Sequence, residues 1–330
     1  MDDALRIHPD AEGALAGARL VQVAVYVRDM AVSRAFYEEA LGLELVEADE
    51  GSAVYDTGPA RLRLRRADDE VVTLDGSDPS ADLTFLVRDL DAVRGALEAR
   101  GVAFSETLRY VIGATTGFQD PDGHRISLYE PSSMAMTWPS GSKIRKLLRL
   151  GGKDVAGYGS GAPAVGGPSA ADGSAEGLGG CELVYLFLFV PDAEEAIAFY
   201  HGVLGLPYLE CRACRRGSTE HQQGVVKYDA GGLMLTTHLY EGPEAEAAGA
   251  LSAERMKGLA PVFRVDDLER VAAALAERGV RTGRIVASEG GRTARFEDPF
   301  GRIFHLLEGA PAGAGAAGGG RMAEIPAGGR

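Results

Sequence analysis

The chain contains one sequence pattern twice, and this repeat limits the possible folds more than any other feature. Residues 21–47 (VQVAVYVRDMAVSRAFYEEALGLELVE) align without a gap with residues 184–210 (VYLFLFVPDAEEAIAFYHGVLGLPYLE). The second halves align as well: 83–102 with 261–280, and 118–130 with 296–308. A repeat of this length indicates duplicated structural units, and it shows every candidate site position in two copies.

Each copy has the pattern of two units, and each unit is a strand, a helix and three further strands. In the first unit, Asp29 is a candidate helix N-cap, Gly42 a candidate C-cap, and Val32, Ala35, Phe36 and Leu41 form the expected apolar face of the helix. We expect its strands near 20–27, 44–48, 52–56 and 61–65, and those of the second unit near 82–87, 103–107, 114–119 and 124–130, with a helix over 90–99. Units three and four follow the same plan over 182–238 and 258–308.

The repeat divides the chain into five segments. They are an N-terminal extension (1–19), a first domain (20–131), a basic short helix with a linker (132–181), a second domain (182–309) and a tail (310–330). Because 151–180 is mostly Gly, Ala, Ser and Pro, we expect it to be flexible and dispensable for folding, and the tail to be disordered. Cleavage within 151–180 should release two folded halves, unless units pair across the two sequence copies. The basic segment 142–153 is expected to lie on its own domain, with docking to a partner or a membrane surface as the alternative.

Charge and hydropathy exclude several classes of partner. The net charge of −14 argues against nucleic acid or an anionic membrane as the main partner. The first residues, MDDALRIHPD, carry acids where a signal peptide would carry bases, and the longest apolar run (183–190) is too short to span a bilayer. We therefore expect a cytoplasmic protein whose partner is a small molecule, with a homodimer left open.

The combined motifs resemble one known superfamily. A strand followed by D-x-x-x-S/A-x-x-FY-x-x-x-LGL, a strand ending in V-x-DL before a helix, and F-x-DPDGH-x-I-x-LYE are similar to the vicinal oxygen chelate proteins. That group includes glyoxalase I, extradiol dioxygenases, fosfomycin-resistance proteins and bleomycin-binding proteins. The resemblance implies an α+β fold of four βαβββ units that form two glyoxalase/bleomycin-resistance/dioxygenase-type domains. In this family, paired units enclose a cavity that often holds a divalent metal.

The resemblance also implies where metal ligands would stand. One position on the first strand lies seven residues before the capping Asp, its equivalent lies on the partner unit, and a Glu follows the Gly of DPxG by four residues. The first copy offers Gln22, Asp82 and Ser127 there, and the second offers Tyr185, Ala260 and His305. Crosswise pairing would give Gln22, Ala260 and His305, or Tyr185, Asp82 and Ser127. No pairing gives the usual His, His, Glu set, so we expect no metal; if one is present, its ligands would be Gln22 and Asp82.

Glu130 and Glu308 lie three residues beyond the expected ligand position. Strand alternation puts them on the opposite face of the sheet, so a structural role is favoured.

Strand alternation also indicates which side chains line each cavity. In the first copy, Gln22, Tyr26, Arg63, Arg65 and Asp82 are candidates for substrate binding. Because a buried guanidinium is costly without a partner, we expect the two arginines to pair with Asp82 or an anionic ligand, or to reach solvent at an open cavity mouth.

In the second copy, the inward positions combine aromatic rings with a few polar groups, and we expect this cavity to hold the ligand. The candidates for substrate binding are Tyr185, Phe187, Phe189, Met234, His238 and Arg264. Such a wall suits a flat aromatic or polyketide-like molecule. His305 is the candidate general acid or base, with a structural histidine as the alternative.

Three functions remain open. The leading hypothesis is metal-independent binding or transformation of a small organic molecule, either resistance by sequestration or isomerase- or cyclase-type chemistry in secondary metabolism. The second is a metal-dependent dioxygenase or glyoxalase-like lyase that uses Fe, Mn, Ni or Zn with a non-standard ligand set. The third is a non-catalytic partner-binding protein.

Overall fold

A computed structural model describes residues 5–8, 12–67, 81–133, 135, 177–211, 225–239, 258–288 and 290–309. Most of the expected linker, the basic segment 142–153 and the tail 310–330 lie outside these residues. In the described part of the chain, no helix is both long and apolar enough to cross a membrane.

Four βαβββ units make up the fold, which confirms the α+β class. Unit 1 holds β2 (Arg19–Val27), α1 (Met30–Ala35), the π-helical η1 (Phe36–Ala40), β3 (Glu44–Ala48), β4 (Ser52–Asp56) and β5 (Arg61–Arg66). Unit 2 holds β6 (Ala81–Leu86), α2 (Leu90–Glu98), β7 (Leu108–Tyr110), β8 (Gly113–Gln119) and β9 (Arg125–Pro131). The strand expected at 103–107 is therefore wrong, because pairing with β8 begins only at Leu108.

Units 3 and 4 repeat this order. Unit 3 holds β10 (Glu182–Val190), α5 (Ala193–Ile197), η4 (Ala198–Val203), β11 (Tyr208–Cys211), β12 (Val225–Asp229) and β13 (Met234–Leu239). Unit 4 holds β14 (Leu259–Val265), α7 (Leu268–Glu277), β15 (Val286–Ser288), β16 (Gly291–Glu297) and β17 (Ile303–Gly309). A further strand, β1 (Leu5–His8), pairs with β11, so part of the N-terminal extension joins unit 3.

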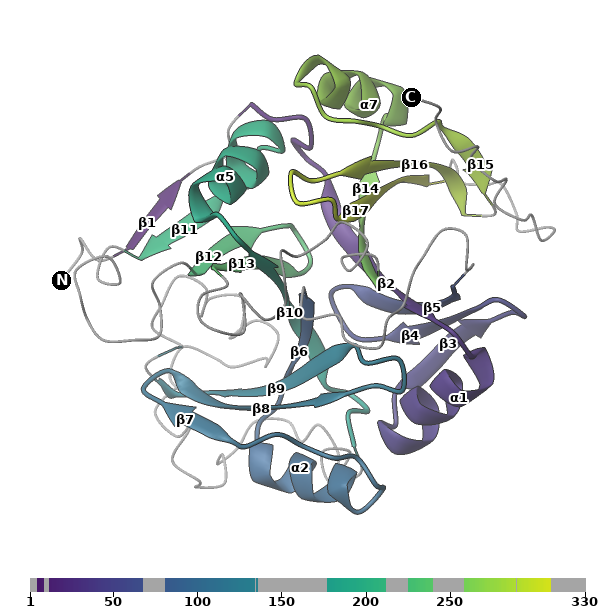
Figure 1. Cartoon of the computed structure of the whole chain (residues 1–330), viewed down its shortest axis with the longest axis vertical. Helices are drawn as coiled ribbons and strands as arrows, with labels where there is room; N and C mark the ends of the chain where they lie inside the picture. The colour runs from purple at the N-terminus through teal and green to yellow at the C-terminus, as the bar shows by residue number, and fades with distance from the viewer. Residues whose placement is uncertain are drawn as a thin grey trace.

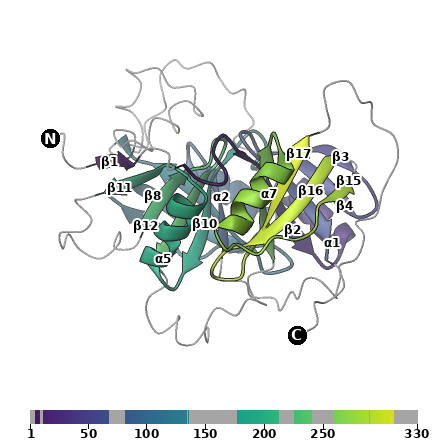
Figure 2. The same cartoon turned by 90° about the horizontal axis from the view of Figure 1, so that it is seen from above.

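The units pair crosswise between the two sequence copies. Sheet A has the order β1-β11-β12-β13-β10-β6-β9-β8-β7 and combines units 2 and 3, whereas sheet B has the order β15-β16-β17-β14-β2-β5-β4-β3 and combines units 1 and 4. Each junction is an antiparallel pair of first strands, β10 with β6 and β14 with β2. Figure 1 shows the two sheets side by side, and Figure 2 shows the same division from above.

Crosswise pairing corrects the expected independence of the two halves. Segments 20–131 and 182–309 are sequence repeats, but each contributes one unit to both sheets. The end of the expected linker is also packed: Leu178 is buried and its N–H donates to the Leu41 carbonyl at 2.6 Å. Cleavage between the repeats would therefore leave two interlocked segments and would not release two folded halves.

The repeated aspartates begin the first helix of each described unit. The carboxylates of Asp29, Asp89, Asp192 and Asp267 accept backbone N–H groups in the first turns of α1, α2, α5 and α7. Gly42 and Gly205 follow η1 and η4 with φ angles of 73° and 81°, values that favour glycine. The capping signals that the sequence offered are confirmed in both copies.

The buried face of the first helix differs from the expected apolar face. Val32 is 52% exposed and Ala35 is exposed, whereas Ser33 and Tyr37 are buried. The reason is polar pairing with unit 2: Ser33 Oγ donates to Asp122 at 3.2 Å and Tyr37 Oη donates to Asp120 at 2.9 Å.

The two DPxG turns hold the sheets together. Tyr200 Oη donates to Asp298 at 2.6 Å, which repeats the Tyr37–Asp120 bond. After the first turn, His124 Nε2 lies 2.7 Å from the Tyr26 carbonyl oxygen, and after the second, Arg302 donates to the Phe189 carbonyl. His124 is 2% exposed and links unit 2 of sheet A to β2 of sheet B.

Strand alternation separates a helix-packed face from an opposite face in each sheet. Leu20, Val23, Val25 and Val27 of β2, and Leu183, Leu186, Leu188 and Val190 of β10, belong to the hydrophobic core. One register shift in each strand, next to Val21 in β2 and next to Val184 in β10, interrupts the alternation of side chains. Leu20 and Leu183 therefore belong to the core, and Val21 and Val184 do not. The remaining positions, Gln22, Ala24 and Tyr26 or Tyr185, Phe187 and Phe189, point away from the helices.

Candidate functional site

Each sheet therefore has one face that is not packed on the core, and these two faces carry the candidate site residues. Face A is formed by side chains of β6, β9, β10 and β13: Asp82, Thr84, Arg125, Ser127, Tyr129, Tyr185, Phe187, Phe189, Met234, Thr236 and His238. Face B is formed by side chains of β2, β5, β14, β16 and β17: Gln22, Ala24, Tyr26, Arg61, Arg63, Arg65, Ala260, Val262, Arg295 and His305.

A row of aromatic rings crosses the centre of face A. The ring centroids of Tyr129 and Tyr185 lie 6.1 Å apart, and those of Tyr185 and Phe187 lie 5.6 Å apart. Further along β10, Phe189 meets the His238 ring edge to face at 5.6 Å. Tyr185 is buried, but Phe187 and Phe189 remain half-buried and present ring surface away from the core.

Two cations stand against these rings. Lys227 Nζ lies 4.8 Å from the Tyr185 centroid, and the Arg125 guanidinium carbon lies 5.6 Å from the Phe189 centroid. Both distances are in the range of cation–π attraction. Neither residue was a candidate from the sequence, although alternation along β9 and β12 could have placed them on this face.

A buried carboxylate lies beside the aromatic row. Asp82 is 8% exposed and is opposite Phe187 in the strand register. Ser127 Oγ donates to it at 2.6 Å and Thr84 Oγ1 donates to it at 3.4 Å. Burial raises the pKa of Asp82, while the hydrogen bond from Ser127 and the charge of Arg125 oppose this shift. A carboxyl group in this state can hold or release a proton closer to neutrality than an exposed Asp.

The β13 side of face A supplies Met234, Thr236 and His238. Met234 and Thr236 are fully or almost fully buried, and His238 is half-buried. The Thr236 hydroxyl oxygen is buried and has no hydrogen-bond partner within the described residues. Since Thr236 is opposite Phe187 in the register, its hydroxyl is a polar group at the aromatic row that a ligand could satisfy.

Face B is built around a tyrosine–histidine pair. Tyr26 Oη and His305 Nε2 lie 3.3 Å apart, and both side chains are half-buried. Burial, together with the charges of Arg65 and Arg295, lowers the pKa of His305 to about 4. Burial raises the pKa of Tyr26. Both groups are therefore neutral around pH 7, and they form an uncharged hydrogen-bonding pair among arginines.

Three arginines of β5 share face B. Arg61, Arg63 and Arg65 pair in register with Gln22, Ala24 and Tyr26. Leu62 and Leu64 are core residues, as expected. Asp82 cannot serve as the counterion that the sequence suggested, because it belongs to sheet A and the arginines belong to sheet B.

The structure thus separates residues that the sequence grouped into one pocket. Tyr185, Phe187, Phe189, Met234 and His238 share face A, whereas His305 lies on face B. The reason is crosswise pairing, which assigns units 3 and 4 to different sheets. The expected second-copy pocket is therefore wrong as a grouping, and each face takes half of its side chains from the other copy.

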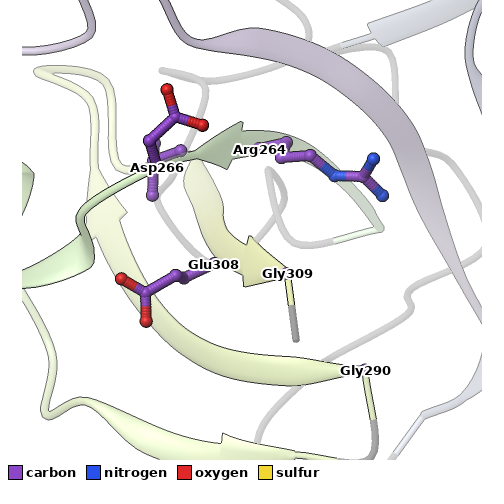
Figure 3. A pocket seen from close by; sticks show the side chains of 6 residues that line it. Arg264, Asp266, Gly290, Glu308 and Gly309 are labelled. Carbon is purple, nitrogen blue, oxygen red and sulfur yellow. The ribbon is translucent and has the colours of Figure 1, made fainter. Parts of the chain in front are cut away.

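Arg264 lies at the edge of sheet B. It is exposed and lines an open pocket of about 410 Å³ with Val265, Asp266, Gly290, Glu308 and Gly309. Figure 3 shows the guanidinium pointing away from the Asp266 and Glu308 carboxylates. Because β14 belongs to sheet B, Arg264 does not contribute to the aromatic row of face A.

The donor sets on the two faces do not fit the divalent metal that the family implies. With the observed crosswise pairing, the positions equivalent to family ligands are Gln22, Ala260 and His305 on face B, and Tyr185, Asp82 and Ser127 on face A. Face B has a methyl group at one of these positions, and face A offers one carboxylate that two hydroxyls already engage. Neither set resembles a first-row metal site.

Glu130 and Glu308 have the structural role that alternation indicated. Each accepts the N–H of the first residue of a helix, Leu90 at 2.9 Å and Leu268 at 3.1 Å. Within the described residues, Glu308 also forms the one group of acids close enough to share a metal, with Asp267 and Glu269. Arg292 pairs with both glutamates of that group, and Asp267 caps α7, so these carboxylates already have partners.

Comparison with known proteins identifies the family. The model of the Glyoxalase/Bleomycin resistance protein/Dioxygenase superfamily matches residues 19–128 and 182–306. This chain belongs to that superfamily. The resemblance inferred from the sequence motifs is confirmed, and among curated proteins none matches the chain.

Solved structures share the fold at low sequence identity. Glyoxalase I from Zea mays is 14% identical with a TM-score of 0.51, and the alignment covers 88% of this chain and 92% of that one. A substituted form of the maize enzyme gives 15% identity and a TM-score of 0.55, with 88% and 94% covered. A "putative dioxygenase" from Bacillus subtilis gives 13%, a TM-score of 0.54, and 92% and 87% covered. At these identities the likeness establishes the architecture alone.

Proposed function

We propose that this superfamily member binds a flat aromatic organic molecule on face A without a catalytic metal. The observation that carries the proposal is the row formed by Tyr129 of β9 and by Tyr185 and Phe187 of β10, continued by Phe189, on one sheet face. Aromatic rings that keep exposed surface favour stacking with a planar ligand.

The polar groups around the row support the same ligand class. Asp82 and the Thr236 hydroxyl are both buried and both opposite Phe187 in the register. One carboxyl and one hydroxyl at a ring are enough to orient a planar molecule that carries a hydroxyl or carbonyl group. Lys227 and Arg125 flank the rings, so a ligand with electron-rich substituents is favoured over a cationic one.

Any chemistry on this face would pass through Asp82. Its pKa is raised by burial, so the carboxyl can exchange a proton with a bound enol or phenol. Tyr129 is less suited to this role because its hydroxyl donates to the Ile112 carbonyl at 2.7 Å. Proton transfer without redox change is compatible with isomerase- or cyclase-type reactions, and binding alone is compatible with sequestration.

The proposal is tested by calorimetric titration of the full chain with neutral bicyclic aromatics, beginning with coumarin and 1-naphthol. We expect saturable binding at one site per chain, and Phe187→Ala should weaken it. Ile285→Ala is the matched control, because Ile285 is a large apolar residue that is 36% exposed outside both faces. Equal losses in the two variants, or no saturable binding of any planar probe, would contradict the proposal.

Metal analysis is the second arm of the test. Protein purified without chelators should contain substoichiometric Fe, Mn, Ni and Zn, because neither face offers a suitable donor set. A divalent ion near one per chain, whose binding is lost in Asp82→Asn or Gln22→Ala, would instead support the metal-dependent alternative.

A further inference from the structure

The charged and polar groups around the aromatic row narrow the class of ligand that face A fits. We propose that the planar ligand of face A is an aromatic carboxylate, whose anionic group lies against Lys227 and the Thr236 hydroxyl while its ring stacks on Phe187. This inference rests on the function proposed above, and it narrows the ligand from planar aromatics in general to phenolic acids.

The first support is a line of side chains across five strands of sheet A. Lys227 of β12 pairs in register with Thr236 of β13, which pairs with Phe187 of β10. Phe187 pairs with Asp82 of β6, and Asp82 pairs with Arg125 of β9. Neighbouring strands lie about 4.8 Å apart, so the positions on either side of Phe187 are roughly 10 Å apart at the backbone. A ligand ring on Phe187 therefore has Thr236 and Lys227 at one end and Asp82 at the other.

The second support is the difference in charge between the two ends of this line. At the β6 end, Arg125 is paired in register with Asp82, and the two charges offset each other. At the β12 end, no ion pair among the described residues includes Lys227, whose ammonium stands over an aromatic ring. The nearest acid on the same side of β12, Asp229, accepts the Gly231 N–H at 2.8 Å. A half-buried ammonium in this state favours an anionic group supplied by a ligand.

The third support is the Thr236 hydroxyl, which stands between Lys227 and Phe187 in the register. The Thr236 side chain is buried, and its oxygen has no hydrogen-bond partner within the described residues. Lys227 and Phe187 on either side are each partly exposed, so a ligand can meet this line from solvent. A carboxylate placed there would accept hydrogen bonds from both the hydroxyl and the ammonium.

The experiment is a calorimetric titration of the full chain with 6-hydroxy-2-naphthoate, which carries its carboxylate and hydroxyl at opposite ends of the rings, and with 2-naphthol, which lacks the carboxylate. We expect the naphthoate to bind at least about tenfold more tightly, because a charge-assisted contact is added. Saturable binding of 2-naphthol with equal or weaker binding of the naphthoate would overturn this inference and leave the function proposed for face A standing. No saturable binding of either compound would overturn both.

Variants then locate the carboxylate. Lys227→Met keeps the apolar stem and should remove most of the preference for the naphthoate while changing 2-naphthol binding little. Thr236→Val should weaken naphthoate binding by about fivefold without lowering the midpoint of chemical denaturation, because it removes a buried hydroxyl without a partner among the described residues. Arg66→Met is the matched control, because it removes an exposed cation from sheet B. A preference that survives in Lys227→Met, or one that is lost equally in Arg66→Met, would show that the carboxylate does not lie at Lys227.

Discussion

Face A and face B occupy equivalent places in two sheets of the same design, yet their side chains are opposite in character. Face A has a row of rings with one buried carboxyl group, Asp82, whereas face B has arginines around a neutral tyrosine–histidine pair. The helix-packed sides of both sheets remain alike, with the same capping aspartates and the same Tyr–Asp bonds. The two repeats thus share the contacts that hold the fold, and the two sheets differ in the side chains on the faces away from the helices.

The largest expected effect concerns the contacts that fix the end of each face. Arg302 holds the Phe189 carbonyl of face A and pairs with Asp298 at 3.2 Å, with both side chains buried. Arg302→Met should lower the free energy of unfolding by about 3–5 kcal/mol, because it leaves a buried carboxylate without its cation. His124→Gln, at the equivalent position for face B, should cost only about 1–3 kcal/mol. Chemical denaturation measures both losses. Equal losses would show that the buried Arg302–Asp298 ion pair contributes no more to stability than the contact between His124 and the Tyr26 carbonyl.

The next effect is the dependence of stability on pH. The folded-state pKa of His305 is about 4, below its ordinary value of 6.5, so the unfolded chain binds more protons between these values. Stability should therefore fall as the pH drops from about 6.5 to 4, by about 1–3 kcal/mol after allowance for partial exposure. His305→Gln should remove this part of the slope in denaturation curves measured across that range. A slope that persists unchanged in the variant would show that His305 is not held neutral by its surroundings.

A smaller effect tests whether aromatic binding is confined to face A. Phe187→Ala should weaken binding of a planar aromatic probe by about 10- to 100-fold. Because Phe187 is half-buried, we expect a stability loss below the ~3–5 kcal/mol typical of a fully buried Phe. Arg65→Met should leave aromatic binding unchanged in the same calorimetric titration. Weaker binding of the aromatic probe in Arg65→Met would mean that both faces serve one ligand.

The smallest effect is expected at Asp82, where the sign of the pH dependence is reversed. Burial raises the pKa of Asp82, so the unfolded chain loses its proton first and stability falls as the pH rises through the raised value. Asp82→Asn retains one acceptor oxygen, and its amide NH2 can donate to the other hydroxyl, so it should change stability by less than about 1 kcal/mol, in the stabilising direction near pH 8. A clear destabilisation at pH 8 would indicate that the charged carboxylate is required on face A.

Local features of this fold were predictable from sequence, and long-range pairing was not. The capping aspartates, the glycines after the helices and the core positions of β5 follow from residues close in the chain. The exposed Val32 and the buried His124 were missed because partners about ninety to a hundred residues away decide their environment. The register shifts at Val21 and Val184 also depend on a neighbouring strand from the other repeat.

The candidate site was predictable residue by residue but not as an assembly. Alternation assigned Tyr185, Phe187 and Phe189 to one face and Arg63 and Arg65 to another. It could not say that His305 stands with Tyr26 and not with Phe187, because that depends on which units share a sheet. Arg295 was missed for the same reason, since pairing of β16 with β17 brings it beside His305.

The central claim is that face A binds a planar aromatic molecule and that face B does not. Its most direct test is a crystal structure of the full chain soaked with 1-naphthol. We predict difference density for the aromatic ring against Phe187 and none on face B. Density for the ring on face B, or a metal ion coordinated by Asp82 or Gln22, would contradict this claim.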